Sequence, residues 1–425
     1  MTERIKFYTE NDFQDSPIGK IPRDWDVREL GDERIAKIIA GQSPPSSTYS
    51  KENHGLPFLQ GKTEFGEMFP SPTVYCSKPI KVAQKNDILL SVRAPVGDVN
   101  IAPFECCIGR GIAAIRPRTD KLASTFLFHY LRFEGRRFEA LSTGSTFKAI
   151  RRKEIEKFQV PVPPSIEQRA IIGVLGVVDS AIEFADKVIA KTERLKKGLM
   201  QQLLTRGIGH TEYNDTPIGK IPKHWQVAQL GEYADFRNGI NFNSEQRTSK
   251  GILTIDVRNM YGEGIHVDLK DLYRVSISEN EDFLLRKGDV LFVRSSLKRE
   301  GAGWASLFGG SIEPVTFCSF IIRARLEDKS VLLPEFLTYF LRSDVARRKL
   351  VANAGQVTIS NITQDSLNKL LFPIPPIEEQ RKIASIIATI DEVIRVEKIE
   401  KTKVEQIKQG LMDLLLTGKV RIKVD

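Results

Sequence analysis

The sequence predicts an α+β fold in which two mixed α/β globular domains are combined with two long helices. Three observations predict it: a motif that occurs twice, a proline-free heptad stretch after each globular segment, and an ordinary balance of 41% hydrophobic and 28% charged residues over 425 residues. A chain of this length has room for two domains. We expect the helices to pair as an antiparallel coiled coil, with internal pseudo-twofold symmetry.

The repeated motif opens each half of the chain. Residues 15–30 read DSPIGKIPRDWDVREL and residues 215–230 read DTPIGKIPKHWQVAQL, an offset of 200 positions. A second repeat closes each globular segment: residues 158–175 read FQVPVPPSIEQRAIIGVL and residues 370–387 read LLFPIPPIEEQRKIASII, an offset of 212 positions. Solenoid repeats span about 20–50 residues. The longer period here indicates a tandem domain duplication.

Each globular segment reads as short strands joined by turns, with a helical stretch near its end. Residues 88–92 and 290–293 are apolar, partly β-branched runs bounded by turn-forming residues, which predict strands. Residues 125–138 and 334–350 predict helices. The predicted parts are a first globular domain at 1–158, a first long helix at 159–207, a second globular domain at 208–370, and a second long helix with a tail at 371–425.

Long helices follow the two globular segments. No proline occurs in residues 166–204 or 377–416, and apolar residues recur there in alternating steps of three and four, as in a coiled coil. Prolines precede both stretches, and Gly207 and Gly418 follow them, as is typical of helix ends. The predicted apolar seam consists of Ile171, Val174, Val178, Ala181, Ala185, Val188, Leu195 and Leu199 in the first helix and of Ile383, Ile386, Ile390, Val393, Val404, Ile407, Leu411 and Leu414 in the second.

Two acidic residues interrupt the second seam. Glu397 and Glu400 stand where the first copy has Ala185 and Val188, so they either loosen the middle of the coil or face a partner. A lone helix would expose its apolar stripe, which favours packing of the two helices on each other. Because the second domain leaves the far end of the first helix and the second helix returns from that domain, the antiparallel orientation is favoured.

No recognisable catalytic, phosphate-binding or metal-binding motif occurs in the sequence. Gly19-Lys20 and Gly219-Lys220 lack the earlier glycine of a P-loop, and Gly301-Ala302-Gly303-Trp304 reads as a β-turn rather than a dinucleotide-binding loop. The five histidines and four cysteines show no metal-ligand spacing, and an Asn-Pro-Pro-aromatic methyltransferase signature is missing. We therefore expect a binding protein, without a catalytic residue, cofactor or metal, rather than an enzyme.

Composition favours a polyanionic partner and an intracellular protein. The net charge is +9 and the isoelectric point is near 9.2, which suits nucleic acid. The first residues are polar, and the longest apolar run, 170–178, is too short to cross a bilayer. The four cysteines are expected to be buried thiols. We therefore expect a cytoplasmic protein that does not contact a membrane.

Basic and small polar residues gather in turn-like segments at matching places in the two halves. Arginine, lysine, glutamine and asparagine can read base edges, while serine and threonine suit phosphate oxygens. The globular middles otherwise differ, which predicts one frame with two reading surfaces. We expect DNA to contact Arg93, Ser145, Thr146, Lys148, Arg151 and Arg152 in the first half and Arg294, Ser295, Ser296, Lys298, Arg299, Gln356, Thr358, Ser360 and Asn361 in the second.

Two motifs carry a resemblance to a known family. They are the twice-repeated I-G-K-I-P-[RK]-x-W opening and the V-P-x-P-P-x-x-E-Q-R or I-P-P-I-E-E-Q-R start of each long helix. With both motifs in both halves, essentially the whole chain resembles the specificity subunit of type I restriction–modification systems. The resemblance implies two target-recognition domains that read a bipartite sequence in double-stranded DNA, and a coiled coil that sets the spacing between its halves.

The resemblance also implies partner subunits and a shared frame, by which we mean the residues common to the openings of the two long helices. The specificity subunit does no chemistry; it recruits two methyltransferase subunits, which use S-adenosylmethionine to methylate adenine, and restriction subunits that translocate and cleave DNA. We expect the shared helix openings to fix the junction between domain and helix or to face the methyltransferase, a plain helix-cap role being the alternative. These frame residues are Pro163, Pro164, Glu167, Gln168, Arg169, Pro375, Pro376, Glu379, Gln380 and Arg381.

Two other functions are compatible with the residues. A fused restriction enzyme with an unrecognised catalytic site would methylate or cut DNA by itself. A coiled-coil scaffold that does not use DNA would show little salt dependence in any DNA binding, whereas phosphate contacts weaken steeply as salt rises.

Overall fold

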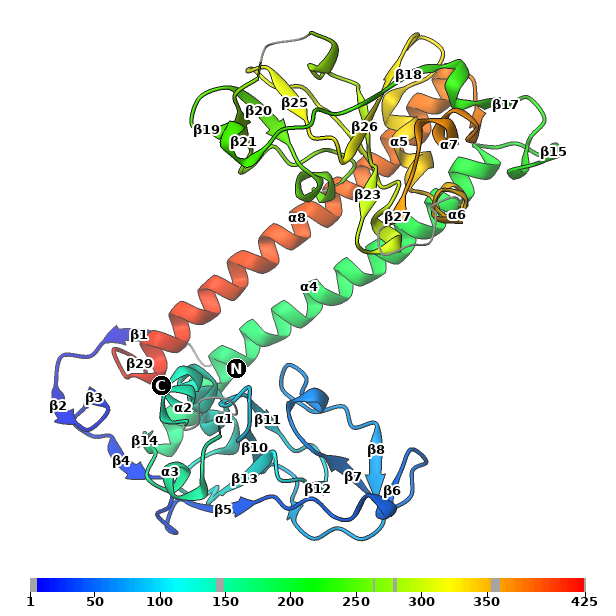
Figure 1. Cartoon of the computed structure of the whole chain (residues 1–425). Helices are drawn as coiled ribbons and strands as arrows, with labels where there is room; N and C mark the ends of the chain where they lie inside the picture. The colour runs from blue at the N-terminus through cyan, green and yellow to red at the C-terminus, as the bar shows by residue number, and fades with distance from the viewer. Residues whose placement is uncertain (1–5, 143–148, 263, 278–280, 353–359, 424–425) are drawn as a thin grey trace. The chain divides into compact units, whose positions relative to one another are not determined.

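The computed structural model describes residues 6–142, 149–262, 264–277, 281–352 and 360–423. The chain divides into two compact units (Figure 1): unit 1 comprises residues 1–184 and 401–425, and unit 2 comprises residues 185–400. Two long helices, α4 (Ser165–Arg206) and α8 (Ile377–Leu416), each contribute to both units.

Two sheets form the centre of unit 1. One is antiparallel, with the order β11-β10-β13-β5; the other has the order β6-β8-β7-β12-β9 and one parallel pair, β7 with β12. Helix α1 (Ser124–Phe133) contacts the first sheet. The strands are β5 (Ala36–Ala40), β6 (Tyr49–Ser50), β7 (Leu56–Leu59), β8 (Val74–Cys76), β9 (Val82–Ala83), β10 (Ile88–Ser91), β11 (Val99–Ile101), β12 (Cys106–Ile108) and β13 (Ile112–Pro117).

Unit 2 repeats this plan with its own residues. Its antiparallel sheet has the order β18-β26-β22-β24, and its second sheet, β19-β21-β20-β25, again has one parallel pair. Helix α5 (Pro334–Arg342) contacts β24 of the first sheet. The strands are β18 (Ala234–Asn238), β19 (Arg247–Thr248), β20 (Ile252–Ile255), β21 (Tyr273–Val275), β22 (Val290–Val293), β24 (Ala305–Leu307), β25 (Val315–Phe317) and β26 (Ile321–Leu326).

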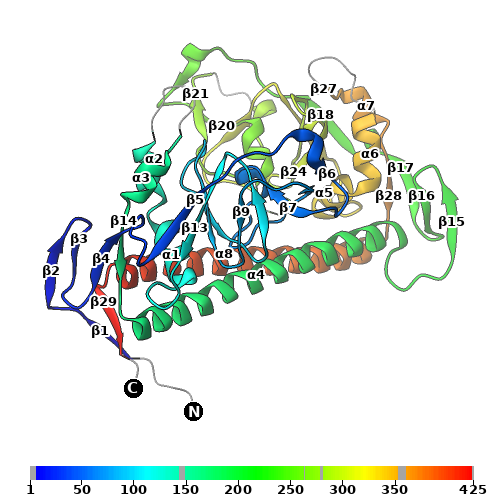
Figure 2. The ribbon, with the colours of Figure 1, turned by 90° about the horizontal axis from the view of Figure 1, so that it is seen from below.

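The repeated motifs form equivalent small strand pairs. In unit 1 the opening motif makes the hairpin β2–β3 and then β4, which pairs with β14 of the second motif; in unit 2 β15–β16 and β17–β28 do the same. Unit 1 also pairs β1 with β29, the first and the last strand of the described residues (Figure 2). The bounds are β1 (Lys6–Thr9), β2 (Phe13–Ser16), β3 (Gly19–Pro22), β4 (Asp26–Glu29), β14 (Gln159–Val162), β15 (Tyr213–Thr216), β16 (Gly219–Pro222), β17 (Gln226–Gln229), β28 (Leu371–Ile374) and β29 (Val420–Lys423).

Each helical stretch predicted inside the globular domains is two helices. Residues 125–138 are divided between α1 and α2 (Gly135–Leu141) because the backbone of Glu134 leaves the helical region. Residues 334–350 are divided between α5 and α6 (Asp344–Ala352), where Ser343 is extended and its hydroxyl accepts a hydrogen bond from Ala346 N. Two short helices, α3 (Arg152–Glu156) and α7 (Gln364–Asn368), precede the strands of the second motif.

The long helices confirm the antiparallel coiled coil within each unit. In unit 1, Asp179 of α4 pairs with Lys408 of α8, and Glu167 pairs with Arg421 just beyond α8. In unit 2, Glu193 pairs with Lys398 and Lys196 pairs with Asp391. In both units the residue numbers fall along α8 as they rise along α4.

The predicted seam is wrong at several positions. Ala181, Leu195, Ile386, Val393, Ile407 and Leu414, which the heptad pattern placed in the seam, are exposed. Ile171 and Ile383 are buried, as predicted. The residue after most of the exposed positions is buried instead, and the other buried apolar residues of the two helices include Leu175, Ile182, Ile189, Leu203, Leu204, Ala384, Ile387, Ile394, Met412, Leu415 and Leu416. Apolar neighbours such as Ala181-Ile182 and Val393-Ile394 offer two seams of the same period. Toward the helix ends the buried face packs into the cores of the globular domains, through Ile171, Leu175 and Leu415 in unit 1 and Leu203, Ile383 and Ile387 in unit 2.

Candidate nucleic-acid interface

In unit 1, two predicted DNA-binding segments lie side by side. Arg93 follows β10 and forms a bridge with Ala149, and Ile150 N donates a hydrogen bond to Val92 O over 3.0 Å. The side chains of Arg93 and Arg151 are both exposed. The sequence places these segments more than fifty residues apart, and only the fold brings them together.

The two equivalent segments of unit 2 also lie side by side, but they carry different side chains. The strand β23 (Ser295–Ser296) pairs with β27 (Ser360–Asn361), and Ile362 N donates to Arg294 O over 2.9 Å. Because β22 and β10 are equivalent, both units place this loop pair at the end of the same strand of the antiparallel sheet. The loop pair is therefore a shared feature of the frame.

The predicted DNA-binding residues differ in their availability. Lys298, Arg299 and Asn361 are exposed, whereas Ser360 is buried and Arg294 is half-buried, with one guanidinium nitrogen 3.3 Å from Ser319 O. Arg152 is exposed but pairs with Glu156, and Ser295 and Ser296 are half-buried. Ser145, Thr146, Lys148, Gln356 and Thr358 lie outside the described residues.

Sequence reasoning missed an apolar cavity beside the loop pair of unit 2. Its volume is about 720 Å³, and its lining includes the large apolar side chains of Leu297, Phe320, Tyr261 and Trp304. The segment Gly301-Ala302-Gly303-Trp304 forms a turn, as expected. The four wall side chains follow no periodic pattern and come from separate segments of the chain, so no sequence signal points to them.

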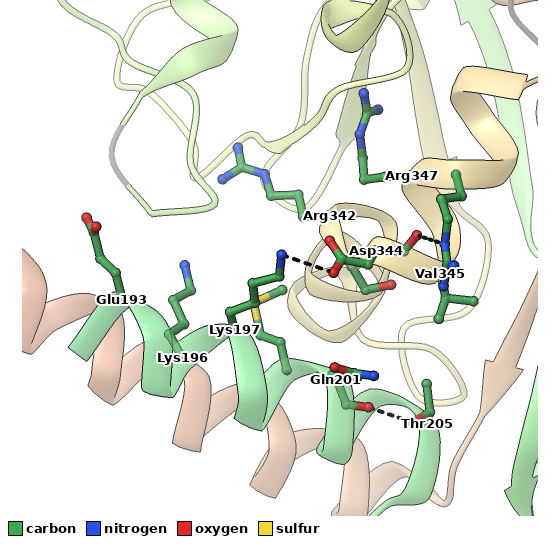
Figure 3. Close-up of a pocket in the computed structure, with 12 residues that line it drawn as sticks. Glu193, Lys196, Lys197, Gln201, Thr205, Arg342, Asp344, Val345 and Arg347 are labelled. Carbon is green, nitrogen blue, oxygen red and sulfur yellow. Dashed lines mark hydrogen bonds and ion pairs between the residues drawn. The ribbon is translucent and has the colours of Figure 1, made fainter. Parts of the chain in front are cut away.

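A second cavity in unit 2 is lined by cations. It has a volume of about 640 Å³ and lies between α4 and the α5–α6 segment. Figure 3 shows Lys197 of α4 directed toward Asp344, with 3.4 Å between the ammonium nitrogen and the carboxylate oxygen. Burial lowers the pKa of Arg342 to about 10. Burial also lowers the pKa of Arg347.

The frame glutamates join each helix start to the opening motif. Glu167, only 5% exposed, accepts a hydrogen bond from Trp25 Nε1 over 2.9 Å. It also accepts two hydrogen bonds from the guanidinium of Arg421, from Nε over 2.8 Å and from Nη2 over 2.7 Å. The hydrogen bonds that Arg421 donates to Glu167 raise the pKa of Arg421 above its usual range. In unit 2, Glu379 accepts from Trp225 Nε1 over 3.0 Å and lies 2.8 Å from His210 Nε2.

The frame glutamines are fully buried and satisfy backbone groups. Gln168 Oε1 accepts from Ala123 N over 2.8 Å, while its Nε2 donates to Lys121 O and Pro163 O. Gln380 makes the same three hydrogen bonds in unit 2, to Leu333 N, Val331 O and Pro375 O. These side chains hold the domain on the helix and are unavailable to a partner. Among the remaining frame residues, Pro163 and Pro375 are buried, whereas Pro164, Pro376, Arg169 and Arg381 are exposed.

The described residues also include cysteines and other possible metal ligands. Over the described residues, no group of three or more His, Cys, Asp or Glu side chains could hold a metal ion. All four cysteines are unpaired and buried, and burial raises the pKa of Cys106, Cys107 and Cys318 to about 12. Within the same described ranges, no helix combines the length and apolar character that a membrane span requires.

Specificity subunits of type I restriction enzymes are similar to this chain in sequence. The putative type I restriction enzyme MjaX specificity subunit of Methanocaldococcus jannaschii is 50% identical over 198 residues, which are 47% of this chain and 47% of that protein. This chain thus spans about half the length of that relative. The type I restriction enzyme MjaVIII specificity subunit of the same organism is 25% identical over 426 residues, or 99% of this chain and 98% of that protein.

Two solved structures share the fold. The S subunit of the type I restriction-modification system from M. genitalium has a TM-score of 0.56 at 17% identity, covering 92% of this chain and 96% of that one. A chain from a structure on assembly and conformational transition of the type I R-M system has a TM-score of 0.59 at 18% identity, covering 94% and 99%. The family model of the type I restriction modification DNA specificity domain matches residues 22–194 and 222–408. These two matches coincide with the two repeated halves, so the chain belongs to the type I restriction modification DNA specificity domain family.

Proposed function

We propose that this chain is the DNA-recognition subunit of a type I restriction–modification complex and has no catalytic site of its own. The domain at residues 1–158 reads one half of a bipartite target in double-stranded DNA, and the domain at 208–370 reads the other. The observation that carries this proposal is the pair of equivalent loops that ends the same strand in each unit but presents different side chains. A shared frame with two dissimilar surfaces suits an asymmetric target with two half-sites.

The helices set the distance between the half-sites in this proposal. Each is one continuous helix, of 42 residues for α4 and 40 for α8, and each is anchored to a domain through a buried glutamine and the neighbouring glutamate. A helix rises about 1.5 Å per residue, so helix length converts directly into a separation along the DNA. Anchors of this kind prevent a domain from sliding along its helix.

Exposed apolar positions on the helices supply the methyltransferase sites. Leu195 in unit 2 and Ile407 in unit 1 are equivalent positions, and they are 56% and 57% exposed. Val177 and Phe184 of unit 1 are more exposed still, at 71% and 69%. Large apolar side chains on a solvent-facing helix favour burial by a partner. We propose one methyltransferase subunit on each unit, two in all, with restriction subunits joining this complex.

The test is reconstitution of the chain with its methyltransferase subunits. The complex should methylate adenine at a defined site and bind DNA with an affinity that falls steeply as salt rises, because phosphate contacts release counterions. The chain alone, incubated with DNA, S-adenosylmethionine and magnesium, should neither methylate nor cut. Methylation or cleavage by the chain alone would reject the recognition-subunit proposal, as would salt-independent binding.

A further inference from the structure

The apolar cavity of unit 2 is open to solvent, and large apolar side chains in its lining are exposed. Leu297 is 85% exposed, Phe320 56% and Tyr261 48%, although all three side chains line one cavity of about 720 Å³. Exposed apolar side chains that gather around one hollow mark an interaction site more often than chance exposure does. The cavity also adjoins β23, the strand that carries Ser295 and Ser296 of the loop pair.

Trp304 forms a preorganised wall of this cavity. Its Nε1 donates a hydrogen bond to Met260 O over 3.1 Å, and its ring lies 5.9 Å from that of Tyr261. The guanidinium groups of Arg342 and Arg347 lie 4.6 and 5.7 Å from the centre of the indole ring. These contacts fix the indole plane before any ligand arrives, so binding costs little side-chain ordering.

The cavity combines an apolar interior with one cation, Lys298, and two carboxylates in its lining. Lys298 lines the cavity and is exposed, and Arg299 beside it is exposed too. Behind the indole, the guanidinium of Arg342 donates to neutral acceptors, namely Ala305 O, Gly264 O and Ser306 Oγ. Two carboxylates, Asp256 and Glu300, also line the cavity, and Asp256 accepts a hydrogen bond from Val257 N. The exposed Lys298 and Arg299 can contact phosphate oxygens beside the cavity, and the apolar interior can contact the apolar part of a base.

The equivalent place in unit 1 is polar. Val293 N donates to Trp304 O over 2.9 Å in unit 2, and Ser91 N donates to Asp98 O over 2.8 Å in unit 1, so Asp98 occupies the position of Trp304. Asp98 pairs with Lys62 over 2.7 Å, and the cavity there, of about 420 Å³, is lined by charged residues as well as apolar ones. The two units therefore differ in chemistry at one and the same structural position.

We propose that the cavity formed by Leu297, Phe320, Tyr261 and Trp304 recognises the C5-methyl group of a thymine in the half-site read by the second domain. Thymine alone among the four bases presents a methyl group in the major groove, and apolar side chains contact it there. The polar equivalent in unit 1 predicts no such requirement for the first half-site. This inference rests on the proposed function, since it specifies what one recognition surface reads.

The test removes single methyl groups from the DNA. Each thymine of the mapped target is replaced in turn by deoxyuridine, which lacks only the C5-methyl group, and binding by the reconstituted methyltransferase complex is measured at fixed salt. One replacement in the second half-site should weaken binding about 3- to 10-fold, the effect expected for one buried methyl group. Replacements in the first half-site should leave binding within about twofold.

Protein variants complete the test. Leu297→Ala and Phe320→Ala should bind thymine- and deoxyuridine-containing targets alike, because the apolar wall is gone; both side chains are exposed, so folding should be retained. Ile312→Ala is the matched control, since Ile312 is a fully exposed apolar residue of the same unit that does not line the cavity. That variant should keep the preference for thymine.

Two outcomes separate this inference from the function on which it rests. Sequence-specific binding with no deoxyuridine effect in the second half-site, or a second half-site without thymine, overturns the thymine inference and leaves the recognition function standing. Absence of any sequence-specific binding by the complex rejects the recognition function itself. An unchanged methyl preference in both Leu297→Ala and Phe320→Ala also overturns the inference.

Discussion

At the scale of residues, the aspartate that forms an ion pair between the two long helices has a different aromatic neighbour in each unit. In unit 2, Asp391 pairs with Lys196 over 2.5 Å and accepts a hydrogen bond from the Tyr339 hydroxyl over 3.0 Å. In unit 1, Asp179 pairs with Lys408, but the residue equivalent to Tyr339 is His129, whose Nε2 lies 3.7 Å from Asp179. Within the described structure, neither ring nitrogen of His129 has a hydrogen-bond partner.

His129 should therefore make unit 1 sensitive to acid. Burial lowers its pKa to about 4, below the value of about 6.5 in the unfolded chain. As pH falls through this window the unfolded state takes up a proton that the folded state does not, so stability decreases. The free energy of unfolding, measured with urea, should be lower at pH 5 than at pH 7, and this residue should account for about 2 kcal/mol of the difference. His129→Tyr, which copies the arrangement of unit 2, should remove that part of the loss; an equal pH dependence would contradict the assignment.

The frame glutamine offers a second prediction at this scale. Gln168→Leu keeps the approximate volume but leaves Ala123 N, Lys121 O and Pro163 O without their partner. We expect a loss of about 2–4 kcal/mol in the free energy of unfolding, because buried polar groups are left unsatisfied. The neighbouring exposed residue provides the control: Arg169→Ala should change stability by less than about 0.5 kcal/mol. Equal effects of the two variants would show that the amide does not anchor the domain.

At the scale of elements, the sequence predicts helices better than it predicts their faces. The long helices begin within a residue of where proline-free sequence begins, because proline and glycine act through local backbone geometry. The face that each helix buries depends on which domain surface it meets. Val174-Leu175 and Ile386-Ile387 offer two apolar faces, and only the packed structure distinguishes them. The same reason explains why the cavity at Trp304, which is assembled from segments distant in sequence, escaped sequence reasoning.

The helix face that the structure buries, which differs from the seam predicted from the heptads, gives two apolar residues different roles. Ile182, 8% exposed, lies in the buried seam, so Ile182→Ala should lower the free energy of unfolding by about 2–4 kcal/mol. Leu195, 56% exposed, lies on the face proposed for the methyltransferase, so Leu195→Asp should leave the melting temperature nearly unchanged. Affinity for the methyltransferase should fall at least about tenfold in this variant, as measured by calorimetry. A stable Ile182→Ala variant, or undiminished methyltransferase affinity in Leu195→Asp, would contradict the assigned faces.

At the scale of the whole molecule, duplication supplies the frame, and the two copies differ at the loops that we propose read DNA. The motifs that are nearly identical in sequence form equivalent strand pairs and helix anchors in both units, which is why they could be predicted. The reading loops diverge in sequence, and five of their predicted residues lie outside the described structure. One equivalent position holds Asp98 in unit 1 and Trp304 in unit 2, so the two surfaces differ in side-chain chemistry there.

The proposed ruler gives a prediction at this scale. Deleting one heptad from α4 and the matching heptad from α8 preserves the helix face that each residue presents, because seven residues complete nearly two turns. The preferred spacer between the two DNA half-sites should become shorter, while the half-sites themselves stay the same. Selection of bound sequences from a library with varied spacers measures both properties. An unchanged spacer preference would reject the ruler.

We propose that each of the two domains of this chain reads one half of a bipartite target. Mapping methylated adenines across the genome of cells that express the chain with its methyltransferase tests this proposal. The comparison is with a variant whose residues 208–370 are replaced by the corresponding domain of a related specificity subunit. We predict a bipartite motif with a fixed spacer, in which the replacement changes one half and leaves the other intact. A single continuous motif, or a change in both halves, would show that the domains do not each read one half-site.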